Sequence, residues 1–190
     1  DEFPMCPECL AEYGDPRNRR FHAQADCCPV CGPEVFLEDR SGETVSGPRA
    51  VERAVALLEK GLIVAVKGIG GFHLAVDATN GDAVSRLRRL KDRGGKPFAV
   101  MAPTLDRIRE FAEVNGGEAE HLASPARPVV ILVKRKKPET AAAIAEAVAP
   151  ENPLIGVMLP YTPLHHLLLE NLDALVMTSA NMSEEPIVAD

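Results

Sequence analysis

Residues 62–78, LIVAVKGIGGFHLAVDA, are the stretch that decides the fold of most of this chain. Residues 62–66 are apolar throughout and short enough for a buried strand. Residues 67–73, KGIGGFH, predict a glycine-rich turn, and residues 74–78 return to an extended pattern. Strands that are apolar along their whole length belong in sheets that helices cover. We therefore expect an α/β domain.

The rest of the chain continues the alternation of helices and strands outward from this stretch. Helical periodicity ends at Gly61 on one side, and on the other Asn80 can cap a helix that must stop near Gly94 and Gly95. Further buried strands are expected at 98–101, 129–133, 155–159 and 174–177, and further helices at 105–112, 117–123 and 163–170. This order predicts a helix-covered sheet.

The composition is that of an ordinary globular protein. The 190 residues suit one domain of about 150 residues with a small appendage. The net charge of −7 argues against general affinity for nucleic acid, because phosphate binding needs an excess of Lys and Arg. There is no long apolar run and no basic-then-apolar leader, so we expect no membrane span and a cytoplasmic location. The chain begins at Asp1 without Met, and we expect it to be a piece of a longer polypeptide.

Two CxxC pairs near the start of the chain predict a zinc site. The ligands are Cys6, Cys9, Cys28 and Cys31, arranged as CxxC-x18-CxxC. Gly32 permits the tight backbone that points amides at metal-bound sulfurs. Two disulfides are the alternative. A segment of about 40 residues with little apolar content needs a cross-link, and CxxC pairs suit a metal better than disulfides. Cys27 is out of phase and is interpreted as a spare thiol, and His22 could replace one cysteine as a ligand.

These features divide the chain into three parts. Residues 1–40 are expected to form the zinc finger, and residues 49–190 the α/β domain. The stretch 36–48 is rich in Glu, Ser, Gly and Pro, and residues 41–48 of it are taken as the linker.

Polar residues gather at three strand ends, which is where ligands bind such sheets. The first group is the glycine-rich turn with Lys67 and His73, for which an ordinary tight turn is the alternative interpretation. The second is residues 91–98, KDRGGKPF, where three cations converge, although cations at a helix end also complement the helix dipole. The third is residues 178–186, TSANMSEEP, which offers neutral donors. Together they predict an anionic nucleotide as the substrate.

Four motifs give the chain a recognisable resemblance. The segments KGIGGFHLAVDATN (67–80), RGGKPFAVM (93–101), LPYTPLHHLL (159–168) and TSANMSEEP (178–186) resemble the YrdC-like domain of the HypF family, the carbamoyltransferases of hydrogenase maturation. Residues 15–24, DPRNRRFHAQ, between the CxxC pairs look like the second of two zinc fingers that precede that domain. The resemblance covers nearly the whole chain, and it implies a YrdC-like twisted mixed sheet covered by helices after a small zinc-binding segment.

The resemblance also implies a reaction. In this family an acylphosphatase domain hydrolyses carbamoyl phosphate, and the carbamate attacks the α-phosphate of ATP in the YrdC-like domain to give carbamoyl adenylate. A C-terminal carbamoyl-transfer domain then passes the carbamoyl group to the partner HypE. ATP with Mg²⁺, carbamate and a structural Zn²⁺ are therefore the expected ligands.

The family's motifs assign the site residues by position. They imply catalytic roles for Lys91, Arg93 and Lys96 and carbamate binding by Lys67 and His73, while His165 is expected to orient its neighbours. The implied ATP-binding residues are Lys91, Arg93, Lys96, Arg127, Thr178, Ser179, Asn181 and Ser183. Cations and donors of this kind offset the charge on a triphosphate during adenylation.

Two alternatives stay open. Threonylcarbamoyl-adenylate synthases of tRNA modification share the YrdC group, but they carry a Pro-Thr-Glu-Thr-type strand end where this chain has Lys67 to Gly70. A zinc-bearing RNA-binding module is the other alternative. Its support is weak, because the basic stretches lack interleaved aromatic residues.

Overall fold

The computed structural model describes residues 4–135, 143–181 and 186–188, and it divides the chain into two compact units. The smaller unit is residues 1–51 and the larger is residues 52–190. Ser183, a predicted ATP ligand, lies outside the described residues. No helix in the described part of the chain combines the length and apolar character needed to cross a membrane.

The smaller unit contains one helix and one hairpin. Helix α1 (Pro7–Gly14) follows Cys6, and strands β1 (Phe36–Glu38) and β2 (Thr44–Ser46) pair antiparallel. Asp39 holds the turn between the strands, because its carboxylate accepts hydrogen bonds from the amides of Ser41 and Glu43. The polar stretch 36–48 therefore forms a hairpin, and residues 41–48, which were expected to be a linker, include its second strand, β2. Helix α2 (Pro48–Glu59) begins where expected.

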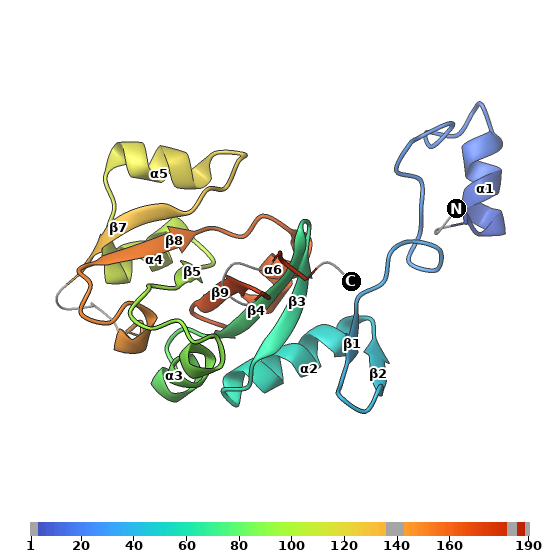
Figure 1. Cartoon of the computed structure of the whole chain (residues 1–190). Coiled ribbons are helices and arrows are strands. Elements are labelled where there is room, and N and C mark those ends of the chain that lie inside the picture. Colours follow the sequence, from blue (N-terminus) through green and yellow to red (C-terminus); the bar gives the residue numbers. More distant parts are fainter. Residues whose placement is uncertain (1–3, 136–142, 182–185, 189–190) are drawn as a thin grey trace. The chain divides into compact units, whose positions relative to one another are not determined.

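The larger unit is built on a seven-stranded mixed sheet (Figure 1) with the order β3-β4-β9-β5-β8-β7-β6. Strands β5 and β8 are parallel, and the other neighbouring pairs are antiparallel. The strands are β3 (Val64–Gly68), β4 (Gly71–Asp77), β5 (Ala99–Met101), β6 (Ala112–Glu113), β7 (Val130–Lys134), β8 (Leu154–Met158) and β9 (Leu175–Ser179). The predicted α/β class and mixed sheet are confirmed.

Four further helices and one 3-10 turn follow α2 in the described part of the larger unit. They are α3 (Gly81–Leu90), α4 (Leu105–Phe111), α5 (Gly116–Ala123) and α6 (Pro163–Leu168), with the 3-10 turn η1 (Glu146–Val148). Asn80, Thr104, Asn115 and Thr162 each accept a hydrogen bond from an amide of the first turn that follows, which explains where α3 to α6 begin. Helix α3 ends earlier than the glycine pair predicts, and its cap is Lys91.

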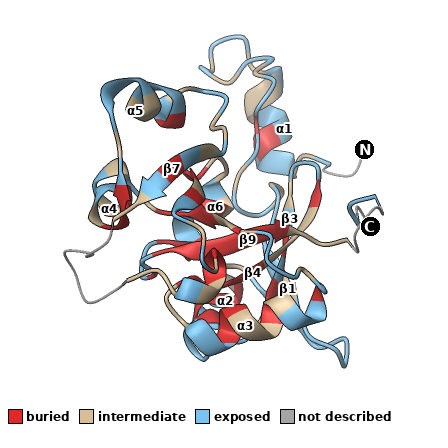
Figure 2. Cartoon of the chain, turned by 60° about the vertical axis from the view of Figure 1, so that its left-hand side comes forward, coloured by how far each residue is buried: buried red, intermediate tan, exposed pale blue. Residues whose placement is uncertain are grey.

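The main hydrophobic core lies on one face of the sheet. Val76, Val176, Val100 and Val157 are neighbours in successive strands of that face, and all are fully buried. Side chains of α3, α4, α5 and η1 complete this cluster. Figure 2 shows the buried positions in red on the strands and on the helices α3, α4 and α5. Because side chains alternate along a strand, residues such as Ala75 and Met177 belong to the opposite face. Buried side chains of α2 and α6 lie outside the main cluster.

The predicted glycine-rich turn is shorter than expected. Lys67 and Phe72 pair across β3 and β4, and Gly68 pairs with Gly71, so only residues 69 and 70 remain outside the strands. Gly71 has a φ of +133°, and an added Cβ would meet the carbonyl oxygen of Val188 at 2.8 Å. The glycines thus permit both the hairpin and the close approach of residues 187–188.

Candidate functional site

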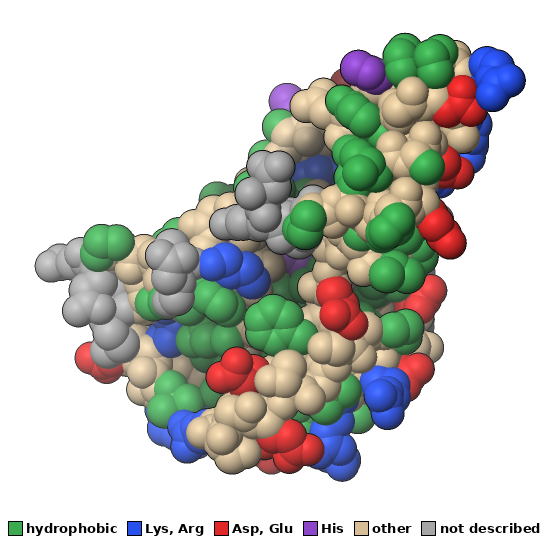
Figure 3. Space-filling model, turned by 90° about the vertical axis from the view of Figure 1, so that its right-hand side faces the viewer, with side chains coloured by type: hydrophobic (Ala, Val, Ile, Leu, Met, Phe, Trp, Pro, Cys, Tyr) green, Lys and Arg blue, Asp and Glu red, His purple; other side chains and the backbone are tan. Residues whose placement is uncertain are grey.

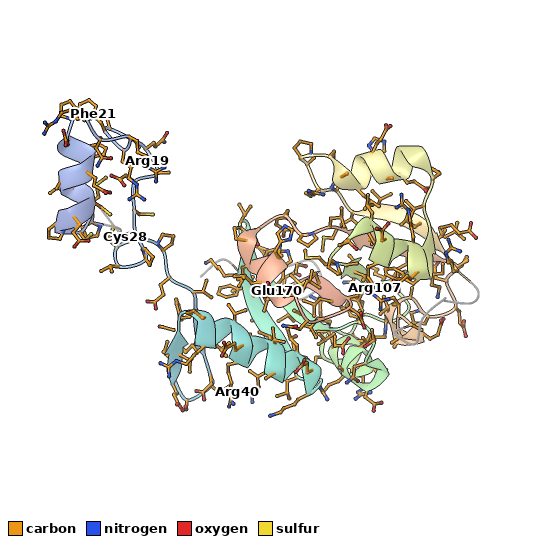
Figure 4. The ribbon with its side chains drawn as sticks, turned by 180° about the vertical axis from the view of Figure 1, so that it is seen from behind. Arg19, Phe21, Cys28, Arg40, Arg107 and Glu170 are labelled. Atoms are coloured by element: carbon orange, nitrogen blue, oxygen red, sulfur yellow. The ribbon has the colours of Figure 1, made fainter. Side chains whose placement is uncertain are left out.

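The four predicted zinc ligands meet in the smaller unit. The Sγ atom of Cys28 lies 3.7 Å from that of Cys6 and 3.8 Å from that of Cys31, and the four Sγ atoms of the set with Cys9 lie within 4.8 Å of one another. A tetrahedral ion with Zn–S bonds of about 2.3 Å places its sulfurs about 3.8 Å apart. The arrangement therefore fits a zinc ion held by four thiolates. Figure 4 shows Cys28 beside α1, which carries Cys9.

The surroundings of this cluster also suit a metal. Hydrogen bonds to the backbone of Cys28 and then of Cys6 lower the pKa of the Cys31 thiol to about 6, whereas burial raises the pKa of the Cys9 thiol, so a bound cation is needed for all four sulfurs to be thiolates. An added Cβ at Gly32 would meet the carbonyl oxygen of Cys28 at 2.9 Å, so this position needs glycine. His22 stacks on Tyr13 with ring centroids 4.8 Å apart and is not part of the cluster. Cys27 is exposed and free, as expected.

The larger unit contains a cavity of about 390 Å³ against the sheet. Its lining comprises His73, Ala99, Ala126, Arg127, Val129, Met158, Tyr161, Met177 and Ser179. Ala75, Met177 and Ala99 are neighbours in register on β4, β9 and β5, and Gly156 follows on β8. Ala75, Ala99 and Gly156 have small side chains or none, which leaves room above the sheet beside Met177. The lining includes one arginine and no carboxylate, which favours an anionic ligand.

Two predicted site residues lie side by side in the lining of the cavity. His73 on β4 and Ser179 on β9 are register partners, so their side chains share a face. The imidazole of His73 lies against Gly68, where an added Cβ would meet Nδ1 at 2.8 Å. That Nδ1 atom is buried and has no hydrogen-bond partner among the described residues. Burial also lowers the pKa of His73, which keeps the imidazole neutral near pH 7.

Lys91 organises the loop that follows β9. Its ammonium donates to the carbonyl oxygen of Ser179 at 2.6 Å and to that of Asn181 at 2.7 Å. A longer contact of 3.4 Å joins it to Asn181 Oδ1, which also accepts from the Ser179 hydroxyl at 2.6 Å. Lys91 is only 8% exposed, and burial followed by the charge of Arg93 lowers its pKa. Lys91, Ser179 and Asn181 therefore form one unit, although 88 residues separate the first two.

Arg93 and Lys96 lie in the loop between α3 and β5. The Arg93 guanidinium donates to the carbonyl oxygen of Pro97 at 2.9 Å and to the Thr178 hydroxyl at 3.4 Å. It also lies 4.7 Å from the centroid of the Phe98 ring. Thr178 alternates with Ser179 on β9, so its side chain is on the core face. Lys96 is exposed.

The other predicted residues are divided between the cavity and the surface. Arg127 lines the cavity, has a φ of +44° and donates to the carbonyl oxygen of Leu122 at 3.3 Å. Lys67 is exposed, and its ammonium lies 4.9 Å from the centroid of Phe72. Because Lys67 pairs with Phe72 while His73 pairs with Val66, Lys67 and His73 occupy opposite faces of the hairpin. The structure thus separates the two residues expected to bind carbamate.

Some cavity residues carried no signal of their own in the sequence. Tyr161, Met158 and Ala99 line the cavity. Met158 and Ala99 are there because of the face of their strand on which they lie, and Tyr161 because it lies in the turn before α6, and only the folded chain reveals these positions. Arg88 was also missed. Its guanidinium donates to the carbonyl oxygen of Ala147 at 2.8 Å and to that of Lys96 at 3.0 Å, so it fastens the loop that carries Arg93 and Lys96.

Two family models match this chain. Residues 56–190 match the Sua5, YciO and YrdC model, described as Telomere recombination, and residues 5–38 match the HypF finger. The first match covers more than half of the chain. The chain therefore belongs to the Sua5–YciO–YrdC family and carries a HypF-type finger ahead of that domain.

Several individual relatives are HypF proteins. Carbamoyltransferase HypF of Rhodobacter capsulatus is 50% identical over 187 residues, which are 98% of this chain and 24% of the relative. A full-length HypF crystallised in a phosphate- and nucleotide-bound form matches with a TM-score of 0.82 and 45% identity, over 99% of this chain and 24% of that one. The crystal structure of HypF from T. kodakarensis matches with a TM-score of 0.86 and 44% identity, over 100% of this chain and 24% of that one. The resemblance to HypF is confirmed, and this chain spans about a quarter of these relatives' length.

Proposed function

We propose that the larger unit forms carbamoyl adenylate from ATP and carbamate, as part of a carbamoyltransferase of hydrogenase maturation. The observation that carries this proposal is the cavity, whose lining includes Arg127, His73 and Ser179 but no carboxylate. The loop fixed by Lys91 adjoins it through Ser179. The 45% identity to a HypF that was crystallised with phosphate and nucleotide adds support for an anionic nucleotide ligand.

The reaction needs positioning and charge stabilisation more than a base. A carbamate oxygen attacks the α-phosphorus, a new P–O bond forms, and the bond to the α,β-bridging oxygen breaks, so that pyrophosphate leaves with the electron pair. Carbamate is already an anion, and no proton has to be removed. Arg93, Lys96 and Arg127 would offset the charge on the phosphates, Ser179, Asn181 and Ser183 would hold them, and Mg²⁺ bound to ATP would neutralise part of that charge.

The contacts of Lys91, His73 and Lys67 suggest a different role for each of these side chains in the reaction. The Lys91 ammonium is already occupied by two carbonyl oxygens, so its role is to hold Ser179 and Asn181 in place. His73 lines the cavity from β4 and would receive the carbamoyl end of the substrate. Lys67 faces away from the cavity and would reach a substrate only from outside it.

The zinc finger has a structural part in this proposal. Four thiolates complete a tetrahedral zinc shell and leave no open position for a substrate. The acylphosphatase and carbamoyl-transfer domains, and the acceptor HypE, would belong to the longer protein and its partner. Charge on the face drawn in Figure 3 is mixed, with Lys and Arg interspersed among Asp and Glu, which gives no support to a nucleic-acid-binding surface there.

Pyrophosphate release by the longer protein that contains this chain tests the function. We expect release that depends on ATP and carbamoyl phosphate and is indifferent to threonine. Stimulation by threonine, with none by carbamoyl phosphate, would replace the proposal by threonylcarbamoyl-adenylate synthesis.

A pair of lysine variants tests the phosphate assignment. Lys96→Ala is expected to weaken ATP binding by about 1–3 kcal/mol, the usual loss for a charge-assisted contact. Lys60→Ala removes another exposed lysine, directly after α2, and is expected to leave ATP binding unchanged. Equal affinities for the two variants in calorimetry would remove Lys96 from the site.

A further inference from the structure

His165 is a buried imidazole whose hydrogen-bonding capacity is unused. It lies on α6 and is 1% exposed. Neither Nδ1 nor Nε2 has a hydrogen-bond partner within the described part of the chain. Buried polar atoms are nearly always paired with protein or with ordered water, so two such nitrogens on one ring need an explanation.

The position of this ring connects it to the cavity. The imidazole packs edge-on against Tyr161, with ring centroids 4.4 Å apart, and Tyr161 lines the cavity. His73 lines the same cavity and is close enough to affect the charge of His165. Its own buried Nδ1 is also without a partner. Three unused nitrogens on two imidazoles therefore lie at or next to the wall of one cavity.

The electrostatics specify the kind of ligand. Burial, followed by His73 and His166, lowers the pKa of His165 to about 4, so the ring is neutral at pH 7. A neutral imidazole supplies one N–H donor and no acidic proton. This is well suited to carbamate, because protonation on its nitrogen releases carbon dioxide. Arg127 is the charged residue of the lining and supplies the complement to an anion.

We propose that His165, which lies behind the lining residue Tyr161, and His73 together form a subsite for a small planar carboxylate-type anion, carbamate or its isostere bicarbonate, at the part of the cavity wall that Tyr161 forms. This inference rests on the proposed function for the identity of the anion, and it assigns to that reaction a residue of α6. His165 is then a specificity-determining residue. Its neutral N–H would donate a hydrogen bond to the carbamoyl end of the substrate while ATP occupies the rest of the site.

Steady-state kinetics on the longer protein test the subsite. Ammonium bicarbonate supplies carbamate by equilibrium and bypasses its delivery from another domain. His165→Phe keeps a ring of similar size but removes both nitrogens, and it is expected to raise the KM for carbamate about threefold to tenfold with the KM for ATP unchanged. His166→Phe, at the exposed neighbouring position, is the matched control and should leave both constants unchanged.

The outcomes separate the two proposals. A wild-type protein that releases pyrophosphate, with a His165→Phe variant whose KM for carbamate is unchanged, would overturn the subsite alone. A wild-type protein that releases none with carbamate would overturn the proposed function instead. In that case ¹⁵N-histidine spectra of the 190-residue chain still decide the subsite. Bicarbonate should shift the ring resonances of His165 and His73 but not those of His166. Unchanged His165 resonances would refute the subsite.

Discussion

Replacing Lys91 by Met tests whether one buried ammonium holds the loop after β9. The variant keeps the length of the side chain but removes the donor for Ser179 O at 2.6 Å, Asn181 O at 2.7 Å and Asn181 Oδ1 at 3.4 Å. A hydrogen bond to a charged group contributes about 1.5–3 kcal/mol. The two short bonds therefore contribute about 3–6 kcal/mol. Burying the ammonium, which is 8% exposed, is itself unfavourable, and the variant avoids this cost, which offsets part of the loss.

The net loss in the free energy of unfolding is expected to be about 2–3 kcal/mol, because water can reach the half-buried carbonyl groups of the loop. Urea unfolding of the 190-residue chain measures it, and equilibrium dialysis should show that ATP binds at least about tenfold more weakly. Lys60→Met, at an exposed position, should stay within about 0.5 kcal/mol of the wild type. If Lys91→Met also stays within that range, or binds ATP normally, Lys91 does not hold the loop.

Three further predictions concern other parts of the molecule. Gly68→Ala should displace the His73 ring, with which its Cβ would collide, and slow carbamate-dependent pyrophosphate release, while Gly70→Ala has open space and should be neutral. One zinc per chain is expected by elemental analysis, and a chelator should remove hydrogen-exchange protection from residues 4–38 but not from 52–135. Burial holds the pKa of His165 at about 4, below its ordinary 6.5, so its contribution to stability is complete above pH 6.5 and falls as the pH drops toward 4. Urea unfolding at pH 7 and pH 4.5 measures how far the free energy of unfolding falls between these two pH values. That fall should be about 2 kcal/mol smaller for His165→Phe than for the wild type, and equal falls would refute the prediction.

The local chemistry of the sequence determined most of the architecture. Apolar runs predicted strands that begin and end within two residues of β3, β5, β7, β8 and β9, because four or five consecutive apolar residues are the length of a short strand. Strand β9 is buried along nearly its whole length, whereas β3 and β7 each place exposed residues on one face, which the apolar runs did not predict. Capping residues such as Asn80 set the helix starts. The CxxC spacing alone was enough to specify the cysteine cluster, because its ligands come in pairs from two short turns.

Tertiary structure decided how the site is assembled. Lys67 and His73 are close in sequence, yet strand alternation puts them on opposite faces, and the register between β3 and β4 fixes which one meets the cavity. Lys91 is predicted from the sequence to bind phosphate, and only the folded chain shows that its ammonium also contacts residues about 90 positions later. His165 and Tyr161 become site residues only where α6 packs beside the cavity. Periodicity within a segment predicts which residues are buried, whereas the partners they meet depend on the pairing of distant segments.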